Sequence, residues 1–170
     1  MHQYLFRSLK ADDNVSDFDC GDNDLNEFLK YDALNNQNGW LSATHVLCDG
    51  EKIIGFFTLV ADTLQKDKIA EADRVDEYSY PKYSCIKLAR LAVDKAYQGC
   101  GVGTELMIYA FAVGRKIVLY EGGKFFTVDA KNTAVGFYKK IGFVPVRSQK
   151  AAETVSMYAD FPLVFERTKE

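Results

Sequence analysis

The sequence is poor in proline and has no long apolar run. Its 170 residues include three prolines, which excludes a proline-rich linker array. No apolar run approaches the roughly 18–20 residues that a membrane-spanning helix needs. The first residues lack the positive and apolar regions of a signal peptide. We therefore expect a cytoplasmic protein with no membrane partner, folded as a single domain over residues 1–170.

Potential metal ligands of the cysteine and histidine type are also few. The four cysteines are Cys20, Cys48, Cys85 and Cys100. None belongs to a C-x-x-C pair, and only His2 and His45 could add imidazole ligands. Structural zinc sites use closely spaced pairs of such ligands, so we expect no metal and four reduced thiols.

The net charge of −3 is unevenly distributed along the chain. Residues 11–77 hold sixteen acidic and five basic side chains, a net of −11, whereas residues 115–150 hold eight basic and two acidic ones, a net of +6. This separation is typical of an anionic ligand near the basic half, but two solvated faces that differ in charge would give the same pattern.

Hydrophobic periodicity and turn residues predict an alternation of strands and helices. Strands are predicted at residues 3–9, 44–48, 53–61, 84–93, 125–129, 143–147 and 155–159, with Asp49-Gly50 as a hairpin turn. Helices are predicted from 22–24 to a break at 35–39, over 104–119, and from Asn132 to Ile141. This order predicts a mixed sheet in an α/β fold, which a stricter classification would call α+β.

Helix caps and one long polar segment refine this interpretation. Asp24 and Glu27 have capping-box spacing, Asn132 is a suitable N-cap, and Gly142 stands where a C′ glycine belongs. Residues 62–79 have too few apolar positions for a core element, so we expect a long loop with a short helix. Loops of that length are often functional.

A glycine-rich turn, Gln98-Gly-Cys-Gly-Val-Gly103, joins a predicted strand to a predicted buried helix. Glycines allow close approach to a ligand, and the N–H groups at a helix start favour phosphate. A dinucleotide fingerprint needs a third glycine at Thr104 or Leu106, and the P-loop pattern does not fit either. The remaining candidates are a pyrophosphate cradle and a tight turn without a ligand.

Two motifs together resemble the GCN5-related N-acetyltransferase family. They are residues 91–93 leading into 98–103, and Asp129-Ala-Lys-Asn132 followed by Gly136-Phe-Tyr138 and Ile141-Gly-Phe143. The resemblance implies a mixed, mostly antiparallel sheet of six to seven strands with a central parallel pair, flanked by helices. It also implies acetyl transfer from acetyl-CoA to a primary amine by direct attack in a ternary complex.

The resemblance assigns roles to individual residues. It implies cofactor contacts at Leu91, Ala92, Val93, Gln98, Gly99, Cys100, Gly101, Val102, Gly103, Thr104, Asn132 and Tyr138. A strand bulge that frees an N–H near Leu91 or Ala92 would stabilise a developing oxyanion. Tyr138 is the catalytic candidate, because a phenol near the sulfur can protonate the departing thiolate. Tyr138 shares a helix face with Ala134, Phe137 and Ile141, and this spacing by itself favours a core aromatic.

The general base is not evident from the sequence. The central strand offers Lys87 and Arg90 rather than an acid. The remaining candidates are Asp129, Asp62, His45 and Tyr83, each of which is also an ordinary structural residue. A water relay, or an amine that arrives already neutral, would remove the need for a side-chain base.

Phe18-Asp-Cys-Gly21 and Leu25-Asn-Glu-Phe-Leu29 narrow the resemblance to a subgroup that includes tRNA-acetylating toxins. RNA binding needs a positive surface, which Lys131, Lys139, Lys140, Arg147 and Lys150 could supply in part. Arg90 is a candidate substrate contact for a phosphate or carboxylate. Its alternative is a salt bridge to the acidic N-terminal half.

The acidity of residues 11–77 favours a cationic acceptor. The sequence therefore ranks a small-molecule or peptide amine first, a toxin acting on aminoacyl-tRNA second, and a non-catalytic acetyl-CoA sensor third. An antitoxin partner, and a homodimer through the aromatic residues of 78–83, stay open.

Overall fold

The computed structural model describes residues 4–148 and 152–161. Its strands are β1 (Leu5–Ser8), β2 (Ala43–Asp49), β3 (Lys52–Gln65), β4 (Lys82–Val93), β5 (Phe125–Lys131), β6 (Val144–Pro145) and β7 (Thr154–Asp160). Its longer helices are α1 (Asn23–Glu27), the π-helical η1 (Phe28–Asp32), α2 (Ala33–Asn38), α3 (Val102–Glu121) and α4 (Val135–Ile141). Short 3₁₀ turns are η2 (Lys66–Lys68), η3 (Glu71–Asp73), η4 (Lys95–Tyr97) and η5 (Asn132–Ala134).

The described strands form one seven-stranded sheet in the order β1-β2-β3-β4-β5-β7-β6. The sheet is mostly antiparallel with a parallel β4–β5 pair, which confirms the predicted fold class. The chain divides into two compact units. Unit 1 holds the described residues up to Val60 together with Leu88–Val113; unit 2 holds Ala61–Lys87 and the described residues from Gly114 onward.

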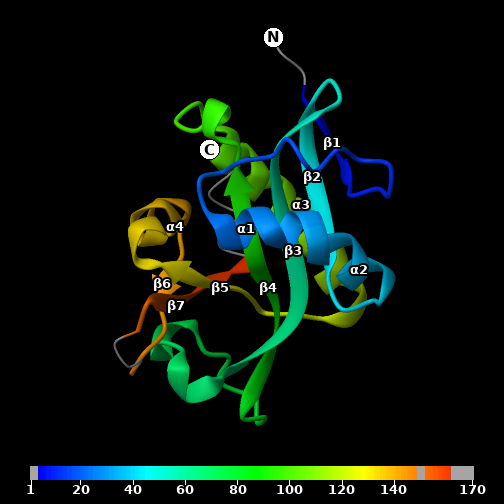
Figure 1. Cartoon of the computed structure of the whole chain (residues 1–170). Coiled ribbons are helices and arrows are strands. Elements are labelled where there is room, and N and C mark those ends of the chain that lie inside the picture. Colours follow the sequence, from blue (N-terminus) through cyan, green and yellow to red (C-terminus); the bar gives the residue numbers. More distant parts are fainter. Residues whose placement is uncertain (1–3, 149–151, 162–170) are drawn as a thin grey trace. The chain divides into compact units, whose positions relative to one another are not determined.

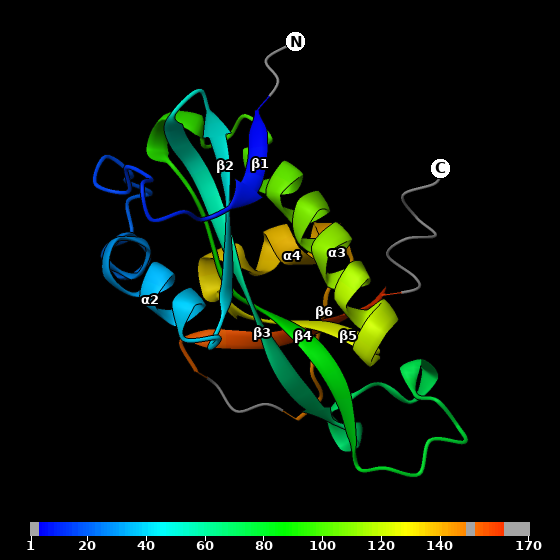
Figure 2. The same ribbon diagram turned by 90° about the vertical axis from the view of Figure 1, so that its right-hand side faces the viewer.

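In unit 1 the N-terminal helical segment (α1, η1 and α2) covers one face of the strands, and the start of α3 covers the opposite face (Figures 1 and 2). On one face, residues from η1, α2 and the strands form a buried cluster that includes Phe28, Leu29, Ala33, Val46, Phe56 and Ala92. On the other face, a Cβ at Gly55 would lie 2.7 Å from Leu106 Cδ1, so a glycine is needed for α3 to approach the strand. Burial from both sides explains the almost continuous apolar run of β3.

The β2–β3 hairpin and the first helix follow local sequence signals. Gly50 has a φ of +60° and Asp49 pairs with Lys52, which confirms the predicted Asp-Gly turn. The N-cap of α1 is Asp22, whose side chain accepts a hydrogen bond from Leu25 N at 3.3 Å. The predicted capping box from Asp24 was therefore wrong by two residues: the helix begins at Asn23, and Asp22 binds the N–H of Leu25 in its first turn.

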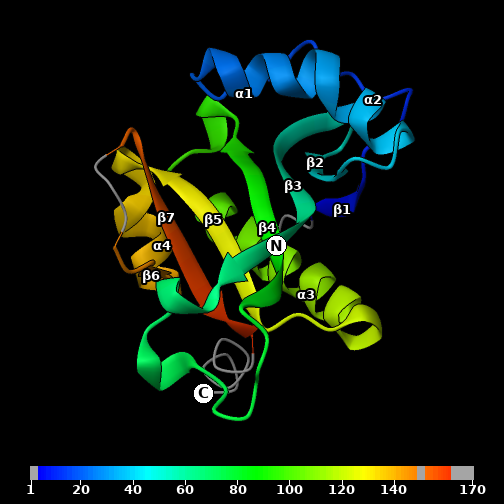
Figure 3. The ribbon, with the colours of Figure 1, turned by 90° about the horizontal axis from the view of Figure 1, so that it is seen from below.

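In unit 2, β5 pairs antiparallel with β7, and α4 runs beside these strands (Figure 3). Lys124 N donates to Ser84 O at 3.0 Å, so β4 and the entry to β5 are directly bonded. A second buried cluster contains Ile69, Tyr83, Cys85, Phe125 and Tyr158.

The segment 62–79 contributes more to the structure than its composition predicts. Strand β3 continues to Gln65 instead of ending at residue 61, with Asp62 and Leu64 half-buried and their neighbours exposed. Ile69 is fully buried in the core of unit 2, so the prediction of no core contribution was wrong. Tyrosine hydroxyls from the strands bind the segment: Tyr158 accepts from Ala70 N and Tyr83 accepts from Val75 N, each at 3.0 Å. The expected short helix is the two 3₁₀ turns, η2 and η3.

The ends of α3 and α4 test the remaining cap predictions. Helix α3 begins two residues before the expected Thr104 and ends where Gly122 adopts a φ of +76°. Gly142, with a φ of +110°, is the predicted C-terminal glycine of α4. Asn132 is not the N-cap of α4. That position is Ala134, and the Asn132 side chain instead donates to Ala152 O at 3.4 Å.

The four cysteines are all free thiols. Among the described residues, no helix combines the length and the apolar character that a membrane crossing requires.

Candidate active site

The predicted cofactor strand ends in a fixed position in unit 1. Ala92 is buried, while Leu91 and Val93 are half-buried. After the strand, Asp94 N donates to Ile54 O at 2.9 Å, and the buried Asp94 carboxylate accepts from Ala96 N at 3.0 Å. Asp94 therefore ends β4 and caps η4, which leads directly into the glycine-rich turn.

The turn has the geometry of an anion cradle. Gly99 and Gly101 have φ values of +74° and +87°, and a Cβ at either would meet no heavy atom within 4 Å. The space beside both glycines is open, so they are required by backbone conformation and not by crowding within the protein. This open backbone fits the approach of a diphosphate.

The helix that follows supplies N–H groups beside this space. Glu105 N donates to Gly101 O at 3.1 Å, which makes Gly101 the residue before the first turn of α3. The N–H groups of Val102, Gly103 and Thr104 thus precede the intrahelical ladder. The positive end of the helix dipole lies at the same residues, which favours an anion there.

The Gln98 side chain is used within the protein. Its Nε2 donates to Val93 O and to Cys20 O, each at 2.9 Å. The backbone N–H of Gln98 also donates within the protein, to Lys95 O at 3.5 Å. Cys100 is exposed, with its Sγ 3.5 Å from Gln98 O.

Arg90 lies on the exposed side of β4. Its guanidinium carbon is 5.0 Å from the centre of the Phe28 ring, and its Nη1 donates to Ala89 O at 2.8 Å. Its contact with the N-terminal helical segment is therefore a cation–π interaction in place of the salt bridge weighed above.

Tyr138 lies in unit 2, on α4. Its side chain is 6% exposed and makes edge-to-face contacts with Phe137 and Phe143, at centroid distances of 5.2 and 5.5 Å. Burial raises the pKa of the Tyr138 phenol above its ordinary value. The phenol is therefore protonated at neutral pH, the form in which it can donate a proton. Asn132 is exposed at the start of η5.

Of the four candidate bases, two carboxylates are engaged by neighbours in unit 2. Asp129 forms an ion pair with Lys87, with 2.5 Å between Oδ2 and Nζ, and accepts from Ser156 Oγ at 2.6 Å. Asp62 accepts from Thr127 Oγ1 at 2.8 Å and from Thr63 N at 2.8 Å.

The other two candidates are packed among aromatic rings. In unit 1, His45 stacks on Phe6 and Phe57, and burial lowers its pKa. In unit 2, Tyr83 is buried and its ring stacks on Tyr78 at 4.7 Å. These contacts give both residues a packing role.

The basic residues that could form an RNA surface are mostly exposed. Lys131, Lys139 and Lys140 are exposed in unit 2, and Arg147 lies 3.5 Å from Glu71 in an exposed ion pair. Lys150 lies outside the described residues.

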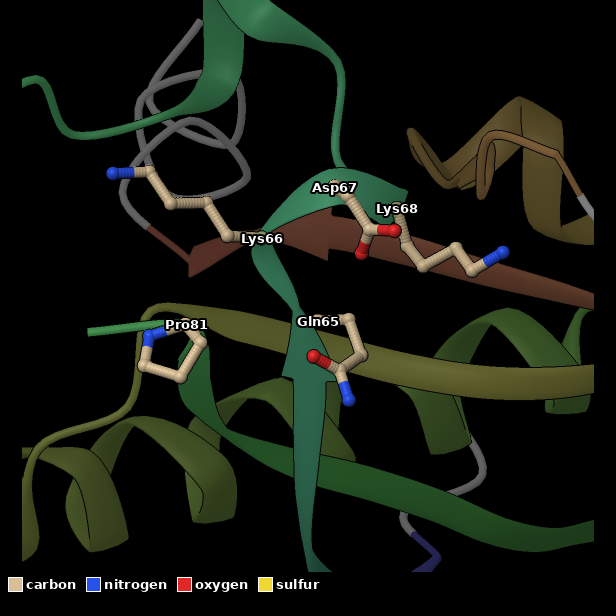
Figure 4. A pocket seen from close by; sticks show the side chains of 5 residues that line it. All are labelled: Gln65, Lys66, Asp67, Lys68 and Pro81. Atoms are coloured by element: carbon tan, nitrogen blue, oxygen red, sulfur yellow. The ribbon is translucent and has the colours of Figure 1, made fainter. Parts of the chain in front are cut away.

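A shallow pocket of about 520 Å³ in unit 2 contains none of the predicted site residues. It is lined by Gln65, Lys66, Asp67, Lys68 and Pro81 (Figure 4). The two lysine side chains point away from each other; one ammonium donates to Tyr78 O and the other to Ser148 O. This pocket therefore does not gather charge around one ligand. The part of the chain described contains no group of three potential metal ligands.

Comparison with known proteins identifies the domain. The sequence matches the acetyltransferase (GNAT) domain family over residues 40–145. A tRNA-acetylating toxin from Mycobacterium tuberculosis is 32% identical over 112 residues, which cover 64% of this chain. The matched region spans 63% of that relative's length.

Two solved structures of similar fold concern the toxin AtaT. AtaT complexed with acetyl-methionyl-tRNAfMet superposes with a TM-score of 0.88 at 23% identity, covering 98% of this chain and 99% of the other. An AtaT mutant bound to the C-terminus of the antitoxin AtaR and acetyl-CoA gives a TM-score of 0.79 at 22% identity, with the same coverage.

Because the family match covers more than half of the sequence, this chain belongs to the acetyltransferase (GNAT) domain family. The domain is an acetyl-CoA-dependent N-acetyltransferase domain. The family and the acetyl donor predicted from the two motifs are thereby confirmed.

Proposed function

We propose that this protein transfers an acetyl group from acetyl-CoA to the amine of an aminoacyl-tRNA. The observation that carries the proposal is the 32% identity to a tRNA-acetylating toxin. The likeness of fold to AtaT over nearly the whole chain supports it. The proposal places the whole chain in one acetyltransferase domain and its activity in the cytoplasm, where aminoacyl-tRNA is used.

Acetyl-CoA would be held by the glycine-rich turn and the end of β4. The N–H groups of residues 99–104 would bind its diphosphate, since the turn is open and the start of α3 favours anions. The backbone of residues 91–93 and the Asn132 side chain would bind the rest of the cofactor. When bound, acetyl-CoA supplies an acetyl group activated as a thioester.

Tyr138 would act as the general acid. Its buried phenol keeps its proton at neutral pH and can give it to the departing thiolate sulfur. Neither candidate carboxylate is free to act as the general base, since Asp129 is paired with Lys87 and Asp62 accepts a hydrogen bond from Thr127. A neutral acceptor amine would attack the thioester carbon, the carbon–sulfur bond would break, and the proton that the nitrogen then loses would pass through water to restore the Tyr138 phenol.

A small-molecule or peptide amine is the second candidate acceptor. It is favoured by the acidity of residues 11–77, whose net charge of −11 suits a cation better than RNA. Under the first proposal, by contrast, the exposed lysines of α4 would contact RNA phosphates, and a protein antitoxin like that of AtaT is a candidate partner.

A CoA-release assay distinguishes these proposals. Acetyl-CoA would be presented with simple amines, basic peptides, aminoacyl-tRNA and uncharged tRNA, after cofactor binding has been confirmed by calorimetry. Release with aminoacyl-tRNA alone supports the main proposal. Release with a simple amine or a peptide supports the second, and binding without release from any acceptor supports a sensor.

A further inference from the structure

The motif Phe18-Asp-Cys-Gly21 has no part in the chemistry proposed above, yet it lies against the glycine-rich turn. Phe18 anchors the motif in the core of unit 1, with its ring 5.4 Å from that of Phe56 in an edge-to-face contact. The residues that follow, 19–21, form a loop that we call the supporting loop. All of its contacts described below are within unit 1.

The supporting loop is joined to the entry of the turn through Lys95. Lys95 N donates to Asp19 O at 2.8 Å, and Lys95 Nζ lies 2.9 Å from Asp19 Oδ2. The pKa of Asp19 is lowered and that of Lys95 is raised, chiefly by the hydrogen bond between them. Gly21 has a φ of +86°, and a Cβ there would lie 2.9 Å from Lys95 Cε. The absence of a side chain at residue 21 therefore permits this contact.

Gln98 makes the second link. Its single amide nitrogen bridges Cys20 O in the supporting loop and Val93 O at the end of β4. A primary amide has two N–H donors, so one side chain can bind both carbonyls. This fixes the first residue of the turn between the strand and the supporting loop.

Asn26 holds the supporting loop in place from α1. Its side chain is 9% exposed; Oδ1 accepts from Cys20 N and Nδ2 donates to Asp19 Oδ1, each at 2.9 Å. Asp19 Oδ1 also accepts from Gly21 N at 2.8 Å. Asn26 touches no residue of the turn in these contacts, and therefore acts on it only through the loop.

We propose that the supporting loop, Gln98 and Asn26 position the glycine-rich turn for the diphosphate of acetyl-CoA. The proposal rests on the proposed function in one respect, that the turn is where the diphosphate binds. It assigns a role to the motif that marks the toxin-like subgroup. Gln98 and Asn26 are then positioning residues, which set the direction of the N–H groups in the turn without reacting themselves.

The contacts that hold the supporting loop differ in how much they stabilise it. The Asp19–Lys95 ion pair is between side chains that are more than half exposed, and such pairs contribute little. The amide of Gln98 binds two backbone carbonyls, and the amide of Asn26 binds the backbone N–H of Cys20 and the Asp19 carboxylate; loss of these hydrogen bonds costs more. Variants of these two residues are therefore the more informative test.

The test is calorimetric titration of acetyl-CoA into wild type, Gln98→Leu, Asn26→Asp and the double variant. Asn26→Asp preserves the shape of the side chain and its acceptor for Cys20 N, but it replaces the donor to Asp19 with a carboxylate oxygen that repels the Asp19 carboxylate. Each single variant should weaken binding by about 10-fold, as expected for lost hydrogen bonds. The double variant should weaken binding by less than the product of the two single fold-changes, because both substitutions act through the same loop. Asn35→Asp is the matched control on α2, where the side chain donates only to Tyr31 O, and it should bind as wild type does.

A second ligand separates positioning from a general loss of structure. S-acetylpantetheine carries the thioester but no diphosphate, so its affinity should be unchanged in both variants. Equal weakening of both ligands would overturn the proposal, as would wild-type affinity for acetyl-CoA in both variants. Should Gln98→Leu fail to fold, as judged by circular dichroism, Asn26→Asp alone decides between these outcomes.

Failure of the proposed function gives a different result. If wild type does not bind acetyl-CoA, or if Gly101→Asp binds it as tightly as wild type does, the turn is not the diphosphate site. The inference is then wrong as well. If Gly101→Asp abolishes binding while Gln98→Leu and Asn26→Asp do not weaken it, only the inference falls.

Discussion

Lys87 on β4 and Asp129 on β5 form an ion pair in unit 2, with 2.5 Å between Nζ and Oδ2. Partial burial would raise the pKa of Asp129, but the hydrogen bonds from Lys87 and Ser156 outweigh it and lower the pKa. Asp129 is therefore a stabilised carboxylate with little tendency to accept a proton. This relationship explains why Asp129, although it belongs to the second family motif, is a poor candidate for the general base.

The first prediction concerns the cradle. Gly101→Asp should abolish acetyl-CoA binding, because an aspartate at a φ of +87° is strained and adds negative charge where the diphosphate binds. Calorimetry measures the affinity. Gly122→Asp is the matched control, since Gly122 also has a positive φ and open space around its Cβ position but lies at the end of α3. Unchanged affinity in Gly101→Asp would remove the turn from the site.

The second prediction concerns the general acid. Tyr138→Phe keeps the buried ring and removes the hydroxyl, so turnover should fall by about 10- to 1000-fold, around the usual contribution of one acid–base group. Acetyl-CoA affinity should be retained. Initial rates of CoA release at saturating acetyl-CoA give the comparison. A wild-type rate would leave Tyr138 as a packing residue of α4.

The third prediction uses a tyrosine of opposite role. The Tyr158 hydroxyl donates to Asp73 at 2.7 Å and accepts from Ala70 N at 3.0 Å. Tyr158→Phe should lower the free energy of unfolding by about 1–3 kcal/mol, because two partners lose their hydrogen bond. Urea unfolding measures this, and the rate of CoA release should stay near wild type. A loss of turnover without a loss of stability would contradict these assignments.

The fourth prediction is a dependence of stability on pH. His45 is packed beside Phe6 and Phe57, its buried Nδ1 has no hydrogen-bond partner among the described residues, and burial lowers its pKa. The unfolded chain then binds the proton more readily than the folded one. Below about pH 6.5 the free energy of unfolding should therefore fall as the pH falls, and above it the contribution of His45 is complete.

His45→Phe tests this account, since a phenylalanine continues the aromatic stack and cannot titrate. Urea unfolding between pH 5 and 8 should show a smaller decrease toward low pH in the variant than in wild type. Acetyl transfer should be unaffected at pH 8. An identical pH dependence would mean that His45 is not the titrating group, and a large loss of transfer would restore it as a candidate base.

Sequence patterns predicted the elements whose causes are local. The glycines at 50, 101 and 142 stand where a positive φ is required, and each marks the turn or helix end expected from it. The alternation of apolar residues located the strands, and the combination of two motifs identified the family. These signals can be read from a few neighbouring residues, because residue type and apolar spacing determine local backbone conformation and burial.

Features that depend on distant partners could not be predicted in this way. Ile69 is an isolated apolar residue in a polar segment, and only its packing beside Tyr83 and Tyr158 reveals it as part of the core. Asn132 is of a residue type that often caps helices, but its side chain donates to Ala152 O. The Gln98 side chain binds the carbonyls of both Val93 and Cys20, and the Cys20 contact joins positions far apart in the sequence.

The central claim is acetyl transfer to an aminoacyl-tRNA, and transfer of radiolabelled acetyl from acetyl-CoA to RNA measures it most directly. Wild type would be incubated with aminoacyl-tRNA, with the same tRNA stripped of its amino acid, and with aminoacyl-tRNA whose amine is already acetylated. The account predicts label in the first RNA alone, released with the amino acid on mild alkaline treatment, and strongly reduced label with Tyr138→Phe. Absence of label from every tested aminoacyl-tRNA, alongside turnover with a simple amine or peptide, would contradict it.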